Sequence, residues 1–372
     1  MGNIIDYVLT EKRSFLDHPF SEVDSLVLSQ SAYLHYGKYV PAELSRNMDL
    51  SLADICVRHH EADLLERVGS AKNNARLIEA LGESPRFGPL RAIYHVDAFD
   101  SSAVEQFSAT TFLLPDGSAY VAFRGTDVTF VGWREDFNMA FITPIPAQTE
   151  SVRYLHNVAG FLASRPLRVG GHSKGGNLAV YSSMSIPKDR QSLIMDIYSH
   201  DGPGFNENIL LGEGFRRIQC RIHKTLPRSS VIGMLLQHQE AYRIVESTRS
   251  GIMQHDPFSW EIEDGEFVYA DDLSQSAAYV NNSLSDWLSS LTLEQRETFV
   301  DALFSVLDAT GAVQFKDLKT DWQVKARAAM SAMKNVDKDT QGFVVKTIGQ
   351  LLLGPVRHLS ETLRLRSTSD VS

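Results

Sequence analysis

Short apolar runs alternate with helical spacings along the middle of this chain, and this alternation constrains the fold more than any other feature. Segments 92–100, 105–114 and 119–127 are rich in β-branched and aromatic residues, and a Pro-Asp-Gly turn at 115–117 predicts a hairpin between the last two. Helical spacings over 151–165 and 175–186 then alternate with strand-like runs over 167–171, 194–204 and 215–227. Because parallel strands are joined by right-handed helical crossovers, the sequence predicts a doubly wound α/β sheet.

The segments on either side of this alternation are predicted to be helical. Residues 20–62 and 70–84 carry apolar positions at helical spacing, which is typical of helices that pack on a common core. Near the other end, Thr292 and Gln295 have capping-box spacing at the start of a long amphipathic run. We therefore expect one domain over 1–282, a helical C-terminal region over 283–365 packed on or appended to it, and a frayed tail over 366–372.

Composition excludes several classes of protein. The formal net charge of -10 argues against a nucleic-acid binder, which usually has a basic face. The two cysteines, Cys56 and Cys220, are too few for a disulfide framework, so we expect a cytoplasmic protein. No apolar run approaches the roughly 18 to 20 residues of a transmembrane segment, and no cluster of His, Cys and Asp has metal-ligand spacing. We expect neither a metal nor a cofactor.

The stretch "VGGHSKGGNL" places Ser173 at the centre of Gly-x-Ser-x-Gly, between an expected strand and an expected helix. This context is typical of a nucleophile elbow, in which glycines allow a tight turn and a close approach of strand and helix. A glycine-rich loop with a capping serine is the alternative. A phosphate-binding loop is disfavoured because the motif lacks a Gly-Lys-Ser/Thr ending.

A serine nucleophile also needs donors for an oxyanion. The backbone N–H of Lys174 would lie at the N-terminus of the following helix. Thr126, in "FRGTD" at the end of a strand, offers a second backbone N–H and a hydroxyl.

Several motifs together resemble a known family. "YVAFRGTD", "GWREDF" with Trp133 and Asp136, and "GGHSKGGNLAVY" look like the class 3 lipase pattern within the α/β-hydrolase superfamily. With "SHDGPGF" and "QHDPFSW" the chain resembles the Mbeg-like group of lipase-like bacterial proteins over roughly residues 20–330. The resemblance implies an α/β-hydrolase fold, with a mostly parallel sheet flanked by helices. It also implies Ser173 as nucleophile and the Thr126 region as part of the oxyanion hole.

The general base should be a histidine late in the chain, since hydrolases of this fold follow the order Ser, Asp or Glu, His. The candidates are His172, His200, His223, His238, His255 and His358. His172 lies inside the elbow and is expected to point away from Ser173. His255, in the polar loop "GIMQHDPFSW" after the last expected sheet strand, is our choice, with a surface-loop histidine as the alternative.

The acid is harder to place. Asp201 closes the strand that follows the nucleophile's helix, and we choose it over an Asx-type turn before "GPG". The class 3 pattern would instead place an aspartate after the next strand, where this chain has Ser229 and Ser230. Asp256 is a poor second because it is the immediate neighbour of His255.

These residues predict a serine hydrolase that cleaves carboxylic esters through a Ser-His-Asp triad, with a small ester or lipid as substrate. The charge of Lys174 in the elbow favours a substrate with a charged acyl group or a phosphate at least as much as a neutral lipid. A binding or regulatory protein that has lost turnover, and an acyltransferase, remain alternatives. A homodimer through the C-terminal helices is a further possibility.

Overall fold

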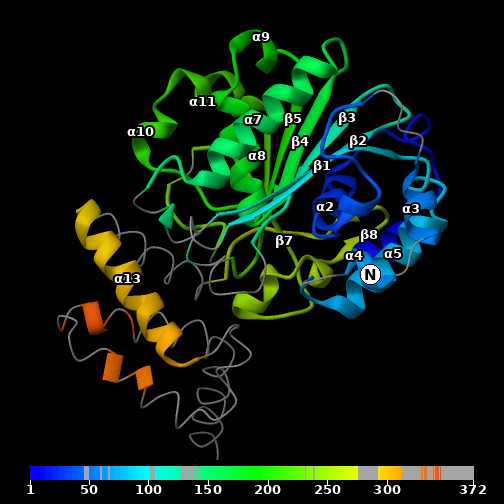
Figure 1. The fold of residues 1–372 in the computed structure, drawn as a ribbon. Helices are drawn as coiled ribbons and strands as arrows, with labels where there is room; N and C mark the ends of the chain where they lie inside the picture. Colours follow the sequence, from blue (N-terminus) through cyan, green and yellow to red (C-terminus); the bar gives the residue numbers. More distant parts are fainter. Residues whose placement is uncertain are drawn as a thin grey trace, which may run out of the picture.

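The computed structural model contains one eight-stranded sheet with helices on both faces (Figure 1). It describes residues 1–45, 50–58, 61–65, 68–100, 105–126, 142–230, 232–237, 239–274 and 292–311, with 134, 138, 139, 328, 329, 331, 332, 338, 340–342 and 344. The strands are β1 (Arg91–Asp100), β2 (Glu105–Leu113), β3 (Ala119–Phe123), β4 (Leu167–His172), β5 (Ile194–His200), β6 (Ile222–Pro227), β7 (Tyr242–Val245), β8 (Ile262–Glu263), β9 (Glu266–Phe267) and β10 (Tyr269–Ala270).

The sheet has the order β1-β2-β3-β4-β5-β6-β7-β10. The strands from β3 to β7 are parallel, while β1, β2 and β10 pair antiparallel with their neighbours. The hairpin expected between β2 and β3 is confirmed, and Gly117 in its turn has a φ of 86°. This mostly parallel sheet flanked by helices is the fold class that the sequence predicts.

Helices cover each face of the sheet (Figure 1). One layer comes from the N-terminal segment and the other from the segments between strands. The helices are α1 (Ile4–Thr10), α2 (Glu22–Ser31), α3 (Leu52–Arg58), α4 (Glu61–Leu64), α5 (Ala71–Glu83), α7 (Pro146–Phe161), α8 (Lys174–Ser185), α9 (Lys188–Gln191), α10 (Glu207–Leu210), α11 (Glu213–Ile218) and α13 (Leu293–Ala309), with 3-10 turns η1 (Tyr36–Lys38), η2 (Gln219–Arg221), η3 (Gly251–His255) and η4 (Pro257–Ser259).

Two details of the expected fold are wrong. The sheet is not doubly wound: β3 to β7 follow one another in chain order, so their right-handed crossovers place α7, α8 and α11 on one face. The opposite face is covered by N-terminal helices instead. The strand expected over 215–227 begins only at Ile222, because α11 extends to Ile218 and buries Phe215 and Ile218 against α8 and the sheet.

Each face of the sheet has its own apolar core. Alternate residues of β3 show the division: Tyr120 and Ala122 pack with the N-terminal helices, whereas Val121 and Phe123 pack with α7 and α8. Every residue of β3 and β4 is buried, as expected for strands covered on both faces.

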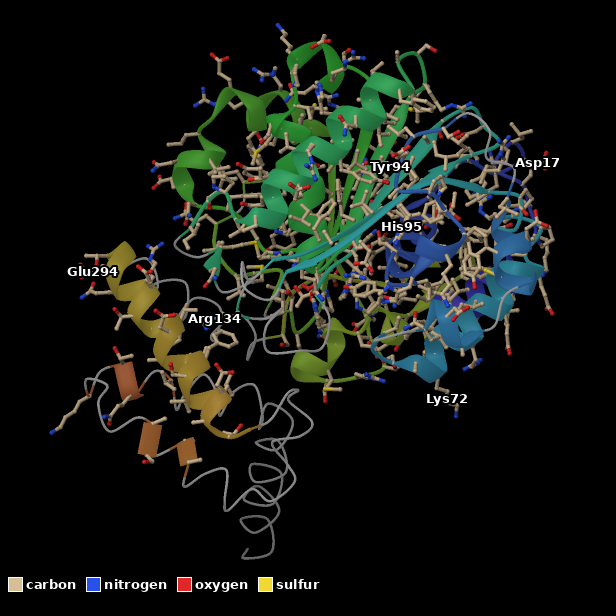
Figure 2. All side chains as sticks on the ribbon, viewed as in Figure 1. Asp17, Lys72, Tyr94, His95, Arg134 and Glu294 are labelled. Atoms are coloured by element: carbon tan, nitrogen blue, oxygen red, sulfur yellow. The ribbon has the colours of Figure 1, made fainter. Side chains whose placement is uncertain are left out.

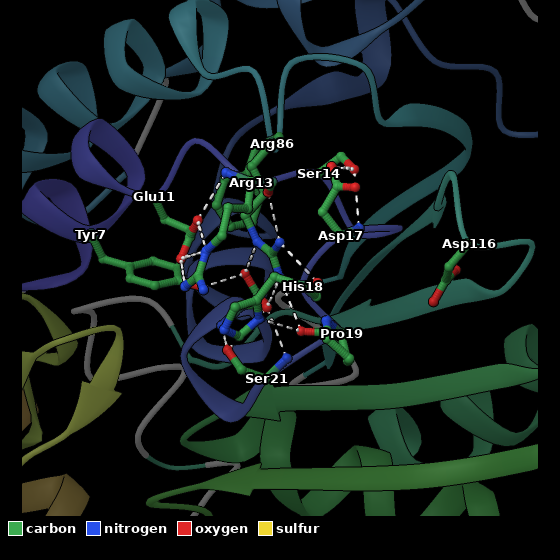
Figure 3. Close-up of polar contacts among 12 residues, drawn as sticks. Tyr7, Glu11, Arg13, Ser14, Asp17, His18, Pro19, Ser21, Arg86 and Asp116 are labelled. Atoms are coloured by element: carbon green, nitrogen blue, oxygen red, sulfur yellow. Dashed lines mark hydrogen bonds and ion pairs between the residues drawn. The ribbon is translucent and has the colours of Figure 1, made fainter.

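A buried ion pair holds the N-terminal layer together. The guanidinium of Arg86 donates to both carboxylate oxygens of Asp24 at 2.7 and 2.6 Å, and both side chains are fully buried. The same guanidinium also donates to the backbone carbonyls of Arg13, His18 and Pro19 (Figure 3). Since a buried charge is tolerated only when it is paired and hydrogen-bonded, this network fixes the 13–19 loop against α2.

The C-terminal region contributes α13, whose expected capping box of Thr292 and Gln295 is confirmed. α13 stands apart from both helical layers (Figure 1). Arg134 lies beside it and pairs with Asp301 at 2.6 Å (Figure 2). None of the helices in the described part of the chain is both long and apolar enough to cross a membrane. The division into domains stays a prediction, and the 366–372 tail lies outside the described residues.

Candidate active site

Ser173 lies on a sharp turn between β4 and α8. Its φ of 60° and ψ of -133° are strained for any residue with a side chain. Two glycines make the turn possible: a Cβ on Gly175 would overlap the carbonyl oxygen of Phe123, and one on Gly171 would overlap the backbone of Gly175. The turn therefore has the geometry of a nucleophile elbow, which holds the serine at the carboxyl edge of the sheet.

His255 lies between Ser173 and Asp201. Its Nε2 is 2.9 Å from Ser173 Oγ, and its Nδ1 is 2.6 Å from Asp201 Oδ2. Since a carboxylate only accepts, Nδ1 carries the proton and Nε2 is left to accept from the serine hydroxyl. The structure thus brings together all three residues chosen from the sequence, in a hydrogen-bonded arrangement that we call the Ser–His–Asp row.

Asp201 is held rigidly at the end of β5. It is fully buried and has a φ of 51°, in the left-handed region that few residues other than glycine adopt. Its second oxygen, Oδ1, accepts from the Ser230 hydroxyl at 2.5 Å and from the Gly233 backbone N–H at 3.1 Å. These two donors stabilise the carboxylate and leave Oδ2 directed at His255.

The other acid considered, Asp256, has different partners. Its Oδ1 accepts from the Phe258 backbone N–H at 3.1 Å, and its Oδ2 lies 2.7 Å from the Arg249 guanidinium. Asp256 therefore caps the η4 turn and pairs with a surface arginine, while His255 is directed at Asp201.

The remaining histidine candidates occupy other environments. His200 is buried between Ser25 and Thr225, and burial lowers its pKa to about 4. His223 lies between Asp196 and Glu22, which raise its pKa to about 9. His238 and His358 lie outside the described residues, as do Trp133 and Asp136.

His172 lies beside the Ser–His–Asp row and has its own partners. It precedes Ser173, and its ring lies beside the ring of His255, with centroids 4.5 Å apart and the ring planes tilted by 36°. Its Nε2 lies 2.8 Å from the backbone carbonyl oxygen of His255. Burial and the neighbouring His255 lower the pKa of His172 well below its usual value.

The two backbone segments expected to bind an oxyanion adjoin the elbow. Lys174 is the first residue of α8, so its N–H lies at the positive end of the helix dipole. Thr126 follows Gly125, whose backbone is so close to the elbow that a Cβ there would overlap the His172 carbonyl oxygen and lie 3.1 Å from Ser173 Cβ.

The side chain of Lys174 contradicts one expectation. It is fully buried, and its ammonium donates to the backbone carbonyl of Gln106 at 2.8 Å. A charge directed at β2 cannot pair with a substrate at the elbow. Lys174 therefore gives no reason to favour a charged or phosphate-bearing substrate.

The Mbeg1-like family model matches residues 81–305, which is more than half of the sequence. The chain belongs to the Mbeg1-like family. This match confirms the resemblance drawn from "YVAFRGTD" and "GGHSKGGNLAVY". No curated protein matches the sequence significantly.

Lipases are among the solved structures to which this chain is similar. The Rhizomucor miehei lipase–propeptide complex is 12% identical, with 63% of this chain and 75% of that chain covered and a TM-score of 0.38. Lipase II from Rhizopus niveus is 14% identical, with 60% and 79% covered and a TM-score of 0.38. A triacylglycerol lipase described as having a serine protease triad is 13% identical, with 61% and 78% covered and a TM-score of 0.37. Likenesses at this level do not bear on activity.

Three residues around the Ser–His–Asp row were not found by reasoning from the sequence. Ser230 was noted only as standing where a carboxylate was expected, Gly233 was not singled out, and Tyr33 was only one of the apolar positions within 20–62. Tyr33 lies 139 positions from His172, and its hydroxyl is 3.3 Å from His172 Nδ1. No local motif connects residues so far apart, so only the fold identifies them.

Proposed function

We propose that this protein is a serine hydrolase that cleaves carboxylic esters, with Ser173 as nucleophile, His255 as general base and Asp201 as the acid that orients it. The observation that carries the proposal is the Ser–His–Asp row, with its distances of 2.9 and 2.6 Å. The strained elbow supports it, because a backbone held in a sparsely populated conformation is typical of functional sites.

In the proposed reaction His255 Nε2 takes the hydroxyl proton as Ser173 Oγ attacks the ester carbonyl carbon. The carbonyl oxygen becomes an oxyanion, which the backbone N–H groups of Lys174 and Thr126 stabilise. The C–O bond to the alcohol then breaks, and the alcohol leaves with the proton from His255. Water attacks the acyl-serine, His255 accepts its proton and returns it to Ser173 Oγ, and the carboxylic acid is released.

Asp201 acts throughout as an ionised acceptor. It keeps the Nδ1–H tautomer of His255 and stabilises the imidazolium that forms when the proton is transferred. The Ser230 and Gly233 donors support this role because they stabilise the charged carboxylate inside a buried environment. The position of Asp201 supports turnover over the alternative of a protein without it, which rested on Ser229 and Ser230 standing after β6.

The substrate is proposed to be a small ester or a lipid. The cytoplasmic location and the exclusion of nucleic-acid partners stay predictions. An acyltransferase would use the same residues with an acceptor other than water. Product analysis distinguishes the two reactions, because the free carboxylic acid accumulates only in hydrolysis.

Hydrolysis of p-nitrophenyl esters of short and long acyl chains tests the proposal, with wild type compared with Ser173→Ala, His255→Ala and Asp201→Asn. We expect each variant to lose about a thousandfold or more of kcat/KM, as removal of triad members does in other serine hydrolases. Asp256→Asn is the matched control, since it changes the adjacent carboxylate and should retain activity. A wild type that turns over no ester, or variants as active as wild type, would refute the proposal.

A further inference from the structure

His172 makes two hydrogen-bonding contacts that the proposed chemistry does not use. Its Nε2 is 2.8 Å from the backbone carbonyl oxygen of His255, and its Nδ1 is 3.3 Å from the hydroxyl of Tyr33. The residue is 4% exposed, and its ring contacts the rings of His255 and Trp260. A buried polar side chain with partners at both nitrogens has a single orientation.

The partners also fix where the proton lies. A carbonyl oxygen can only accept, so His172 Nε2 carries the hydrogen. In a neutral imidazole the other nitrogen is then an acceptor, and the Tyr33 hydroxyl donates to Nδ1. The lowered pKa of His172 agrees with a ring that stays neutral.

Tyr33 connects this pair to two other parts of the protein. It follows α2, in the N-terminal layer, and is therefore placed by the packing of α2 against β4. Its hydroxyl also lies so close to Gly125 that a Cβ there would overlap it. One tyrosine thus contacts the loop before Thr126 and the histidine that contacts His255.

We propose that Tyr33 and His172 are positioning residues that hold the loop carrying His255 where its ring can contact Ser173. The inference rests on the proposed function of His255 as general base. The η3 turn ends at His255, and the Nε2–H of His172 anchors the backbone carbonyl of that last residue. A shift of this backbone would move the His255 ring away from both Ser173 and Asp201.

The neutral state of His172 matters for the same reason. During the reaction His255 becomes a cation, and a second cation beside its ring would oppose the proton transfer. A neutral ring with a fixed tautomer supplies a donor to the backbone and adds no charge. His172 is therefore suited to position His255 without placing a second charge beside it.

Kinetics of matched variants test this role. His172→Phe keeps a ring and removes the donor, His172→Gln keeps a side-chain N–H and removes the ring, and Tyr33→Phe removes only the hydroxyl. Rates are expressed per active site titrated with a fluorophosphonate, so that a misfolded fraction does not count. Tyr242→Phe, which changes an exposed tyrosine on β7, next to the edge strand β10, is the control.

We expect His172→Phe to lower kcat about tenfold to a hundredfold with little change in KM, because misplacement of a catalytic group by about 1 Å costs on this order. His172→Gln should recover part of that loss, and Tyr33→Phe should lower kcat by a smaller factor. An unchanged kcat per titrated site in His172→Phe would overturn the proposal.

A second measurement is independent of turnover. Nitrogen-15 NMR of histidine-labelled wild type, with the His172 signal identified by its absence from His172→Gln, reports which ring nitrogen carries the proton. We expect the Nε2–H form, still neutral at the usual histidine pKa of about 6.5, and a change at Nδ1 alone in Tyr33→Phe. An Nδ1–H tautomer, or titration near the usual histidine pKa, would overturn the proposal. Absence of any esterase activity in wild type would refute the proposed function. The NMR result would still decide whether His172 anchors the His255 backbone.

Discussion

The backbone of Ser173 stores strain that a glycine would relieve. A conformation with φ 60° and ψ -133° costs a residue with a Cβ about 1–3 kcal/mol. Replacement by glycine removes this cost but adds conformational freedom to the unfolded chain, about 0.4–1 kcal/mol. We expect Ser173→Gly to unfold at higher denaturant concentration than Ser173→Ala, by about 1 kcal/mol in the free energy of unfolding. A Ser173→Gly protein no more stable than Ser173→Ala would show that the turn is not strained.

Ser230 is expected to affect the rate through Asp201. Loss of a hydrogen bond to a buried carboxylate costs about 1.5–3 kcal/mol, and the freed oxygen would no longer fix the orientation of the side chain. We expect Ser230→Ala to lower kcat about tenfold or more on a p-nitrophenyl ester. Ser229→Ala is the matched control, because the Ser229 hydroxyl contacts Ser274 instead. Equal losses in the two variants would contradict the assigned role of Ser230.

At the residue level, the sequence predicts those site residues that a short motif or their order along the chain can identify. Ser173 was found from its flanking strand, glycines and helix, and His255 and Asp201 from their positions after strands. The direction of a long side chain is not encoded in this way. Lys174 was expected to face the substrate, whereas the packing of α8 on the sheet buries it against β2.

At the level of elements, α2 is connected to the sheet through charged groups. Glu22, at its first turn, pairs with Arg243 on β7 and with His223 on β6, and His223 also contacts Asp196 on β5. The hydrogen bonds that His223 donates to Asp196 and Glu22 raise its pKa to about 9. A cation at the junction of three strands and a helix therefore contributes to holding the N-terminal layer in place.

This junction gives the stability a specific pH dependence. Because the folded-state pKa of His223 exceeds that of the unfolded chain, its contribution is fully present below about pH 6.5 and is lost as the pH rises through about 9. We expect wild type to be more stable than His223→Gln at pH 6, with the difference shrinking by pH 10. Denaturant titrations of both proteins at these pH values measure it. A difference that is constant with pH would contradict the assignment.

The order of the strands is an element-level property that the sequence did not predict. Apolar periodicity identifies each strand and helix separately. An alternation of strands and helices is compatible with a sheet in which the strand order reverses, as in a doubly wound fold, and with one in which the strands follow chain order. In this chain the N-terminal helices cover one face of the sheet, and the crossover helices α7, α8 and α11 all pack on the opposite face. Similarly, the apolar spacing of 215–221 suits a strand as well as the short helix that forms.

At the scale of the whole molecule, the fold depends on residues before the region matched by the family model. That region begins at residue 81, yet α1, α2 and α3 bury their apolar side chains in the core on one face of the sheet. Arg86 would also lose Asp24, its buried partner. We expect a chain limited to 81–305 to be insoluble or unfolded by circular dichroism, whereas the full chain folds. A cooperative unfolding transition for 81–305 would contradict this.

The C-terminal helix bears on the possible dimer. α13 buries Phe299, Leu303 and Leu307 within this chain, so these side chains already have packing partners in a single copy. The homodimer through the C-terminal helices stays a prediction. Sedimentation of the full chain beside a chain ending at 282 tests it, and an unchanged oligomeric state would reject it.

The proposed function depends on a single activated serine, Ser173. The most direct test is labelling with a fluorophosphonate, followed by mass spectrometry to locate the modified residue. We expect wild type to be labelled at Ser173, Ser173→Ala to remain unlabelled, and His255→Ala and Asp201→Asn to react much more slowly, because the Ser–His–Asp row makes the hydroxyl nucleophilic. Folded wild type that resists the probe, or labelling that persists in Ser173→Ala, would contradict the account.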